Sequence, residues 1–158
     1  MIEGSWKGMK KYLEQEMLCT MLQGRVTYDL THFKPGDSSA IFTVCIDRKL
    51  TKQFGFEFAT KALREKGFNI QYAWDIPFSA RDEYMDDEFS EALEIYLNQP
   101  ISESIYSENP IVRMFAIVDR RVGKRTLIKL RDTVGMQPEW LRQFYEIRFV
   151  SEGIHHTV

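Results

Sequence analysis

The chain has 158 residues, of which 44% are hydrophobic and 13% aromatic, and its formal net charge is -2. This length suits one domain with a real core, and the composition is that of a folded globular protein. The longest apolar runs, Ala40–Ile46 and Met114–Val118, are far shorter than the roughly 20 residues that a membrane-spanning helix needs. The lysines near the N-terminus have no apolar segment behind them. We therefore expect neither a secretory signal nor a membrane location.

The two cysteines bear on the cellular compartment. Cys19 and Cys45 each lie in an apolar setting, which is typical of buried free thiols in a reducing compartment. We therefore expect a cytoplasmic protein, although a disulfide between the two remains an alternative. The sequence leaves the oligomeric state open and indicates no cofactor and no metal site.

The N-terminal segment predicts an amphipathic helix that Ser5 caps and Gly24 ends. Apolar residues recur at three- and four-residue steps, which places them on one face of the helix. These residues are Trp6, Met9, Leu13, Met17 and Met21. We expect this face to pack against a sheet.

Strands are predicted next. Apolar and polar residues alternate over 26–31, and Ala40–Ile46 is a continuous, β-branched apolar run that is typical of a central strand. Residues 50–58 fit either a third strand or the start of a helix. A short helix over 59–66 should end at Gly67, and clear alternation over 68–74 predicts a further strand.

From residue 86 onward the pattern is helical. We expect an acidic helix over 86–97, a helix that begins at Pro110 with Asn109 as its cap, an interruption or end at Gly123, and a last helix after Pro138. The order of elements predicts an α+β fold, with a small, mostly antiparallel N-terminal sheet packed by helices and a helical C-terminal half. We expect residues 1–152 to form a single domain and residues 153–158 a flexible tail.

Charge is distributed unevenly along the chain. Residues 80–109 carry nine acidic residues and one arginine, a sum of -8, whereas residues 110–150 carry nine basic and four acidic residues, a sum of +5. Neighbouring segments of opposite sign either pair within the fold or face solvent separately. Only the second arrangement leaves a basic surface available to an acidic partner.

The densest basic run is the candidate binding site. Arg120, Arg121, Lys124 and Arg125 place four cations within six residues, inside a longer basic segment over 120–131. Arginine and lysine side chains bind phosphates, so we expect this segment to contact nucleic acid or an acidic protein partner. The alternative is that the arginines pair with the acidic helix or cap the carbonyls of their own helix. Gly123-Lys124 is not a nucleotide-binding P-loop, because Val118 stands where that motif has its first glycine and Arg125 stands where it has Ser or Thr.

An enzymatic alternative rests on Asp37, Asp47 and Lys49. Their spacing resembles the Asp…Asp/Glu-x-Lys set of restriction-endonuclease-like nucleases, in which two carboxylates hold Mg²⁺ and the lysine positions the attacking water. The match is imperfect, because Arg48 stands where that family has an apolar residue. One extended strand would also separate the two aspartates by about 30 Å, at roughly 3.3 Å per residue.

Four motifs resemble those of an uncharacterised family of small bacterial proteins. They are Trp6-x-x-Met9-Lys10, Leu22-x-Gly24-Arg25-Val26-x-Tyr28, Val118-Asp119-Arg120-Arg121-Val122-Gly123-Lys124-Arg125 and Phe144-Tyr145-x-Ile147-Arg148. The resemblance covers about the first thirty and the last forty-five residues. It implies a bacterial cytosolic protein, and it implies no particular activity.

Overall fold

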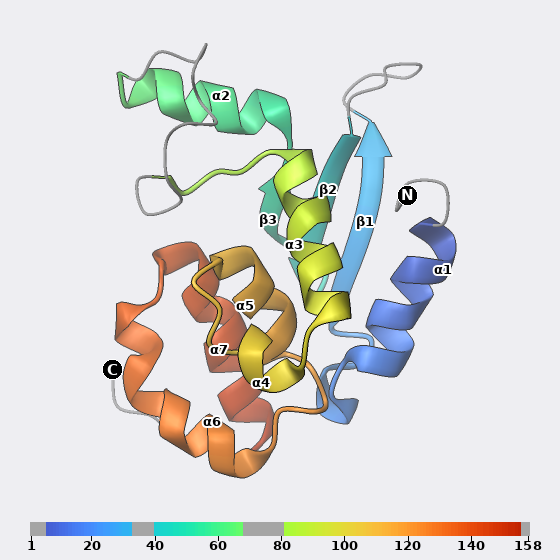
Figure 1. Cartoon of the computed structure of the whole chain (residues 1–158), viewed down its shortest axis with the longest axis vertical. Helices are drawn as coiled ribbons and strands as arrows, with labels where there is room; N and C mark the ends of the chain where they lie inside the picture. Colours follow the sequence, from blue (N-terminus) through green and yellow to red (C-terminus); the bar gives the residue numbers. More distant parts are fainter. Residues whose placement is uncertain (1–5, 33–39, 68–80, 156–158) are drawn as a thin grey trace.

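The computed structural model describes residues 6–32, 40–67 and 81–155 (Figure 1). Its sheet has three strands in the order β1-β2-β3, and both pairings are antiparallel. The strands are β1 (Val26–His32), β2 (Ala40–Ile46) and β3 (Lys49–Phe54). The apolar run Ala40–Ile46 is therefore the central strand, as predicted. The strand expected over 68–74 lies outside the described residues.

The segment that fitted both a strand and a helix contains one of each. Strand β3 ends at Phe54, and α2 (Phe56–Glu65) begins after Gly55. A two-residue turn joins β2 to β3, because Ile46 pairs directly with Lys49. Both turn residues have positive φ, 51° at Asp47 and 67° at Arg48, which is the backbone that tight β-hairpins require.

The first helix is shorter than predicted. Helix α1 (Trp6–Lys11) continues as a π-helical turn over Tyr12–Met17 and ends there, and a 3₁₀ turn follows over Thr20–Leu22. Leu13 is 2% exposed, as expected for the core-facing stripe, but Met21 is 61% exposed. The prediction that Met21 shares this stripe was wrong, because the backbone becomes extended at Leu18 and the helical periodicity stops. Ser5 lies outside the described residues.

The C-terminal half is helical, as predicted. It contains α3 (Asp86–Asn98), α4 (Ile101–Ser104), α5 (Pro110–Ile117), α6 (Lys124–Leu130), a 3₁₀ segment (Arg131–Met136) and α7 (Glu139–Ser151). The side chain of Asn109 accepts a hydrogen bond from the amide of Ile111, which confirms the predicted cap. Ile154 is buried, and residues 156–158 of the expected tail lie outside the described part.

One hydrophobic core joins the sheet to the helices. Helix α3 lies across the sheet, and α5 packs against both α3 and α7 (Figure 1). Aromatic rings link these layers: the ring centroids of Phe42 and Phe89 are 4.2 Å apart, and those of Phe89 and Phe115 are 5.3 Å apart. None of the helices in the described ranges has both the length and the apolar character needed to cross a bilayer.

Candidate functional site

The basic run lies where α5 turns into α6. We call residues 118–125 the α5–α6 corner. Its backbone joins the end of the first helix, because the amide of Cys19 donates to the carbonyl of Val118 at 3.0 Å and the amide of Arg120 donates to the carbonyl of Met17 at 2.8 Å. These two bonds form a short antiparallel bridge between Leu18 and Asp119. The corner is therefore fixed to a segment about a hundred residues earlier in the chain.

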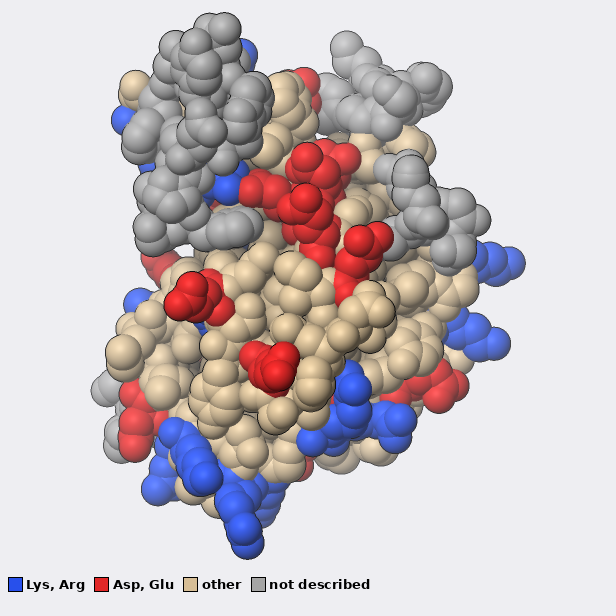
Figure 2. Space-filling model, viewed as in Figure 1, with Lys and Arg blue, Asp and Glu red and all other residues tan. Residues whose placement is uncertain are grey.

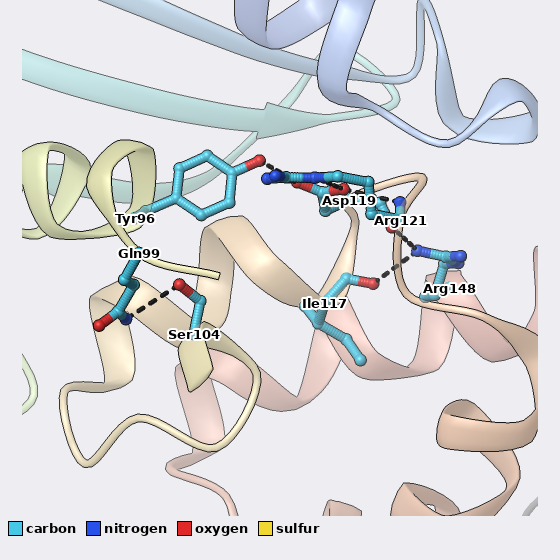
Figure 3. Close-up of polar contacts among 7 residues, drawn as sticks. All are labelled: Tyr96, Gln99, Ser104, Ile117, Asp119, Arg121 and Arg148. Atoms are coloured by element: carbon cyan, nitrogen blue, oxygen red, sulfur yellow. Dashed lines mark hydrogen bonds and ion pairs between the residues drawn. The ribbon is translucent and has the colours of Figure 1, made fainter. Parts of the chain in front are cut away.

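Asp119 is the buried acidic centre of the corner, and its side chain has no exposed surface. Its carboxylate accepts hydrogen bonds from the backbone amide of Arg121 at 2.7 Å and from Nη2 of the same residue at 2.8 Å. The hydroxyl of Tyr96, on α3, donates to Oδ2 of Asp119, the same oxygen that Nη2 of Arg121 binds (Figure 3). The hydrogen bond to Asp119 raises the pKa of Arg121, and burial raises the pKa of Tyr96. At neutral pH the tyrosine therefore stays a protonated donor.

Arg148 closes the corner from the opposite side. This residue of α7 is 2% exposed. Its guanidinium donates to the carbonyls of Ile117 at 3.0 Å, Asp119 at 2.7 Å and Val122 at 2.8 Å, and Figure 3 shows the side chain directed at this turn. Arg148 thus provides donors to carbonyls at the end of α5 and in the turn that follows it, where the Asp119 carbonyl also accepts from the amide of Val122 at 3.2 Å. A buried cation that lost these acceptors would be strongly destabilising.

The structural role of Arg148 was not predicted. A signal was available, because Arg148 follows Phe144 by four residues and so lies on the apolar stripe of the last helix. The idea that Arg120 or Arg121 caps the carbonyls of its own helix was wrong, since Arg148 makes those bonds.

The four predicted binding residues divide into two groups. Arg121 is held by Asp119 through an ion pair of 2.8 Å, and it packs over the ring of Tyr96 at 5.9 Å. Arg120, Lys124 and Arg125 are exposed and make no ion pair with any residue in the described ranges. Three of the four predicted residues are therefore available to a partner.

The internal pairing expected between the corner and the acidic helix is not found among the described residues. In α3, Glu88 instead forms an ion pair with Arg81. Acidic side chains gather where α3 begins, whereas basic side chains gather over α6 and the loop before it, at the opposite end of the molecule (Figure 2). The two charge blocks therefore face solvent separately.

The basic surface extends past the corner. Residues 120–131 contain six lysines and arginines and no acidic residue. Lys129 and Arg131, the two cations beyond the corner, are also exposed. Asp132, which directly follows this segment, is exposed as well. An acidic ligand would therefore meet several cations and one flanking carboxylate.

The proposed nuclease residues are only partly described. Asp37 lies outside the described residues. Asp47 binds Arg25 through both carboxylate oxygens, at 2.9 and 3.1 Å, and these hydrogen bonds lower the pKa of Asp47. Lys49 is exposed at the start of β3. Within the described ranges no three His, Cys, Asp or Glu residues lie close enough together to hold a metal ion. The nuclease alternative stays a prediction.

The model of the SF0329 protein family matches residues 5–149. This span includes the middle of the chain, which the four motifs of the uncharacterised bacterial family did not cover. No curated protein matches the chain, and no solved structure does.

Proposed function

The chain belongs to the SF0329 protein family, and we propose that it is a non-enzymatic binding module whose exposed basic residues contact the phosphates of nucleic acid. The observation that carries this proposal is the position of Arg120, Lys124 and Arg125. They are exposed and make no ion pair within the described part of the chain, and they project from a backbone that Arg148 and Asp119 hold in place.

The fixed backbone supports a binding role. Binding costs entropy when side chains and loops must be ordered, and a preorganised backbone reduces that cost. The hydrogen bonds from Arg148 to Asp119 and Val122 fix this turn before any ligand arrives. Only the exposed side chains would then need to be ordered on binding.

Nucleic acid fits this surface better than an acidic protein does. Duplex DNA presents about one negative charge per 1.7 Å of its axis. A compact set of cations can therefore contact several phosphates at any position along the duplex. The guanidinium groups of Arg120 and Arg125 can each bind a phosphate through two hydrogen bonds. Residues 120–131 include no aromatic side chain, so stacking on single-stranded bases has no support.

We also infer a bacterial, cytoplasmic protein. Cys19 and Cys45 are free thiols, as is usual in a reducing compartment, and the motif resemblance is to bacterial proteins. In that compartment the basic surface would have access to nucleic acid.

Fluorescence anisotropy with a labelled duplex tests the proposal. The wild-type protein should bind duplex DNA or RNA at about 50 mM salt, and the logarithm of the binding constant should fall linearly with the logarithm of salt concentration. Polyglutamate serves as the competitor that represents an acidic protein. Absence of duplex binding at low salt would contradict the proposal, and displacement of the duplex by polyglutamate at equal charge concentration would favour a protein partner.

A further inference from the structure

A hollow of about 310 Å³ lies beside the edge strand β3, and the α5–α6 corner contributes no residue to it. Its lining comes from β3, from the segment before α3 and from α7. The lining residues are Lys52, Asp82, Glu83, Glu139, Trp140 and Gln143. Glu139 and Gln143 are exposed, so the hollow opens to solvent on the α7 side.

Lys52 is the unusual member of this lining, because its side chain is only 5% exposed. It alternates along β3 onto the same face as the buried Phe54 and so points towards the helices. Its ammonium group donates to the carbonyl of Asp82 and lies 3.3 Å from the carboxylate of Glu83. Two aromatic rings lie close to it, with Nζ 5.1 Å from the ring centroid of Trp140 and 5.6 Å from that of Tyr84.

Burial raises the neutral fraction of this amine above that of an exposed lysine. Burial lowers the pKa of Lys52, and the charge of Glu83 opposes that effect only in part. A lysine is nucleophilic only when it is deprotonated, and burial beside apolar groups is one way in which proteins activate it. The amine therefore combines a raised neutral fraction with a hollow that can admit a small molecule.

We propose that Lys52 is a reactive amine that forms a reversible imine with a small, uncharged aldehyde bound in this hollow. The amine nitrogen attacks the carbonyl carbon, a C–N bond forms, and the carbonyl oxygen becomes a hydroxyl. The nitrogen then loses its remaining proton, the C=N bond forms, and the hydroxyl leaves as water. Amine and aldehyde thus give imine and water, with no change of oxidation state.

The neighbouring charges support both the proton transfers and the choice of ligand. The carboxylate of Glu83, 3.3 Å from the nitrogen, can accept the proton that the amine loses and return it to the departing hydroxyl. Asp82, Glu83 and Glu139 also line the hollow. These three carboxylates against one lysine disfavour an anionic aldehyde.

The nearby Lys66 gives the experiment an internal control. Lys66 forms an ion pair with Asp82 at 3.2 Å, and its side chain is 41% exposed. If Lys52 only joins the segment before α3 to β3, its burial should protect it from the aldehyde, and it should react more slowly than Lys66. A lysine that serves as a reactive amine would react faster despite its burial.

The test uses the folded full-length protein, a limiting amount of propionaldehyde and sodium cyanoborohydride to trap the imine at pH 7. Peptide mass spectrometry then gives the rate of alkylation at each lysine. Lys52 should be alkylated several times faster than Lys66, and this preference should disappear in urea. Glyoxylate, an anionic aldehyde, should show a weaker preference for Lys52.

A variant completes the test. Lys52→Arg keeps the positive charge but cannot form an imine, so the fast-reacting fraction should be lost while alkylation of Lys66 is unchanged. If this variant does not fold, the proposal is tested by the alkylation rate of Lys52 relative to that of Lys66 in the wild-type protein. Alkylation of Lys52 in the folded wild type at or below the rate of Lys66 would overturn the proposal.

Discussion

The Nη1 atom of Arg148 donates to the backbone carbonyl of Asp119 at 2.7 Å, across 29 positions of sequence. This bond joins the last helix to the corner between α5 and α6. The basic run on this corner has two kinds of cation, one that pairs with Asp119 and others that do not. Asp119 is buried and holds Arg121 in an ion pair, although the Arg121 side chain is still 40% exposed. The cations on either side of Arg121 are exposed and make no ion pair with the described residues.

Replacement of Arg148 by methionine should strongly destabilise the protein. The carbonyls of Ile117, Asp119 and Val122 would lose a buried donor, and removal of one partner from a buried charged network typically costs about 3–5 kcal/mol. Urea unfolding followed by circular dichroism measures the loss. Arg131→Met, at an exposed position, is the matched control and should change the free energy of unfolding by less than about 0.5 kcal/mol. Equal stability of the two variants would contradict the role given to Arg148.

Leu13→Ala tests the packing of the first helix on the sheet. Leu13 is 2% exposed and belongs to the main core, so the variant should lose about 2–5 kcal/mol of stability. Met21→Ala removes a side chain that is 61% exposed and should have little effect. Urea midpoints of both variants check the prediction, and a Met21→Ala variant as unstable as Leu13→Ala would show that the helix continues beyond Met17.

Stability should fall at alkaline pH because of the buried tyrosines. Burial raises the pKa of Tyr84 from 10.0 to about 12 and also raises the pKa of Tyr96. The folded protein therefore keeps phenol protons that the unfolded chain releases above about pH 10. The free energy of unfolding should be insensitive to these groups below pH 9 and should decrease from pH 10 to pH 12.

Tyr96→Phe separates this effect from other titrations. The variant should show a shallower loss of stability above pH 10. At pH 7 it should lose about 1.5–3 kcal/mol, because Asp119 loses a hydrogen bond. Tyr106→Phe, at a position that is 58% exposed, should behave like the wild-type protein. Urea midpoints between pH 7 and pH 11 give both quantities, and an unchanged alkaline slope in Tyr96→Phe would refute this assignment.

Local patterns predicted the elements whose determinants lie close together in sequence. Alternation identified β1, the β-branched run identified β2, and Asn109 followed by Pro110 marked the start of α5. The end of the first helix was not predictable in this way. It depends on bonds from Cys19 to Val118 and from Arg120 to Met17, which join segments that are distant in sequence.

The candidate site was predictable only in its location. The density of positive charge located residues 120–131, but it could not distinguish Arg121, which binds Asp119, from neighbours that make no ion pair with the described residues. That distinction depends on Tyr96 and Arg148, which lie on other helices. The burial of Lys52 was not predicted either, because a lysine in a strand is usually exposed. Trp140 and Tyr84, which pack near its ammonium group, come from segments distant in sequence.

The most direct test of the binding proposal is the salt dependence of duplex binding in a triple variant, Arg120→Gln with Lys124→Gln and Arg125→Gln. Arg121 is left in place because it is structural. The control replaces three exposed lysines elsewhere, Lys7, Lys11 and Lys61, by glutamine and so has the same net charge. If each corner cation contacts one phosphate, the log-log slope should flatten by about 2.7 units, at roughly 0.9 per phosphate, in the corner variant only. An equal change in both variants, or no change in either, would contradict a binding site at the corner.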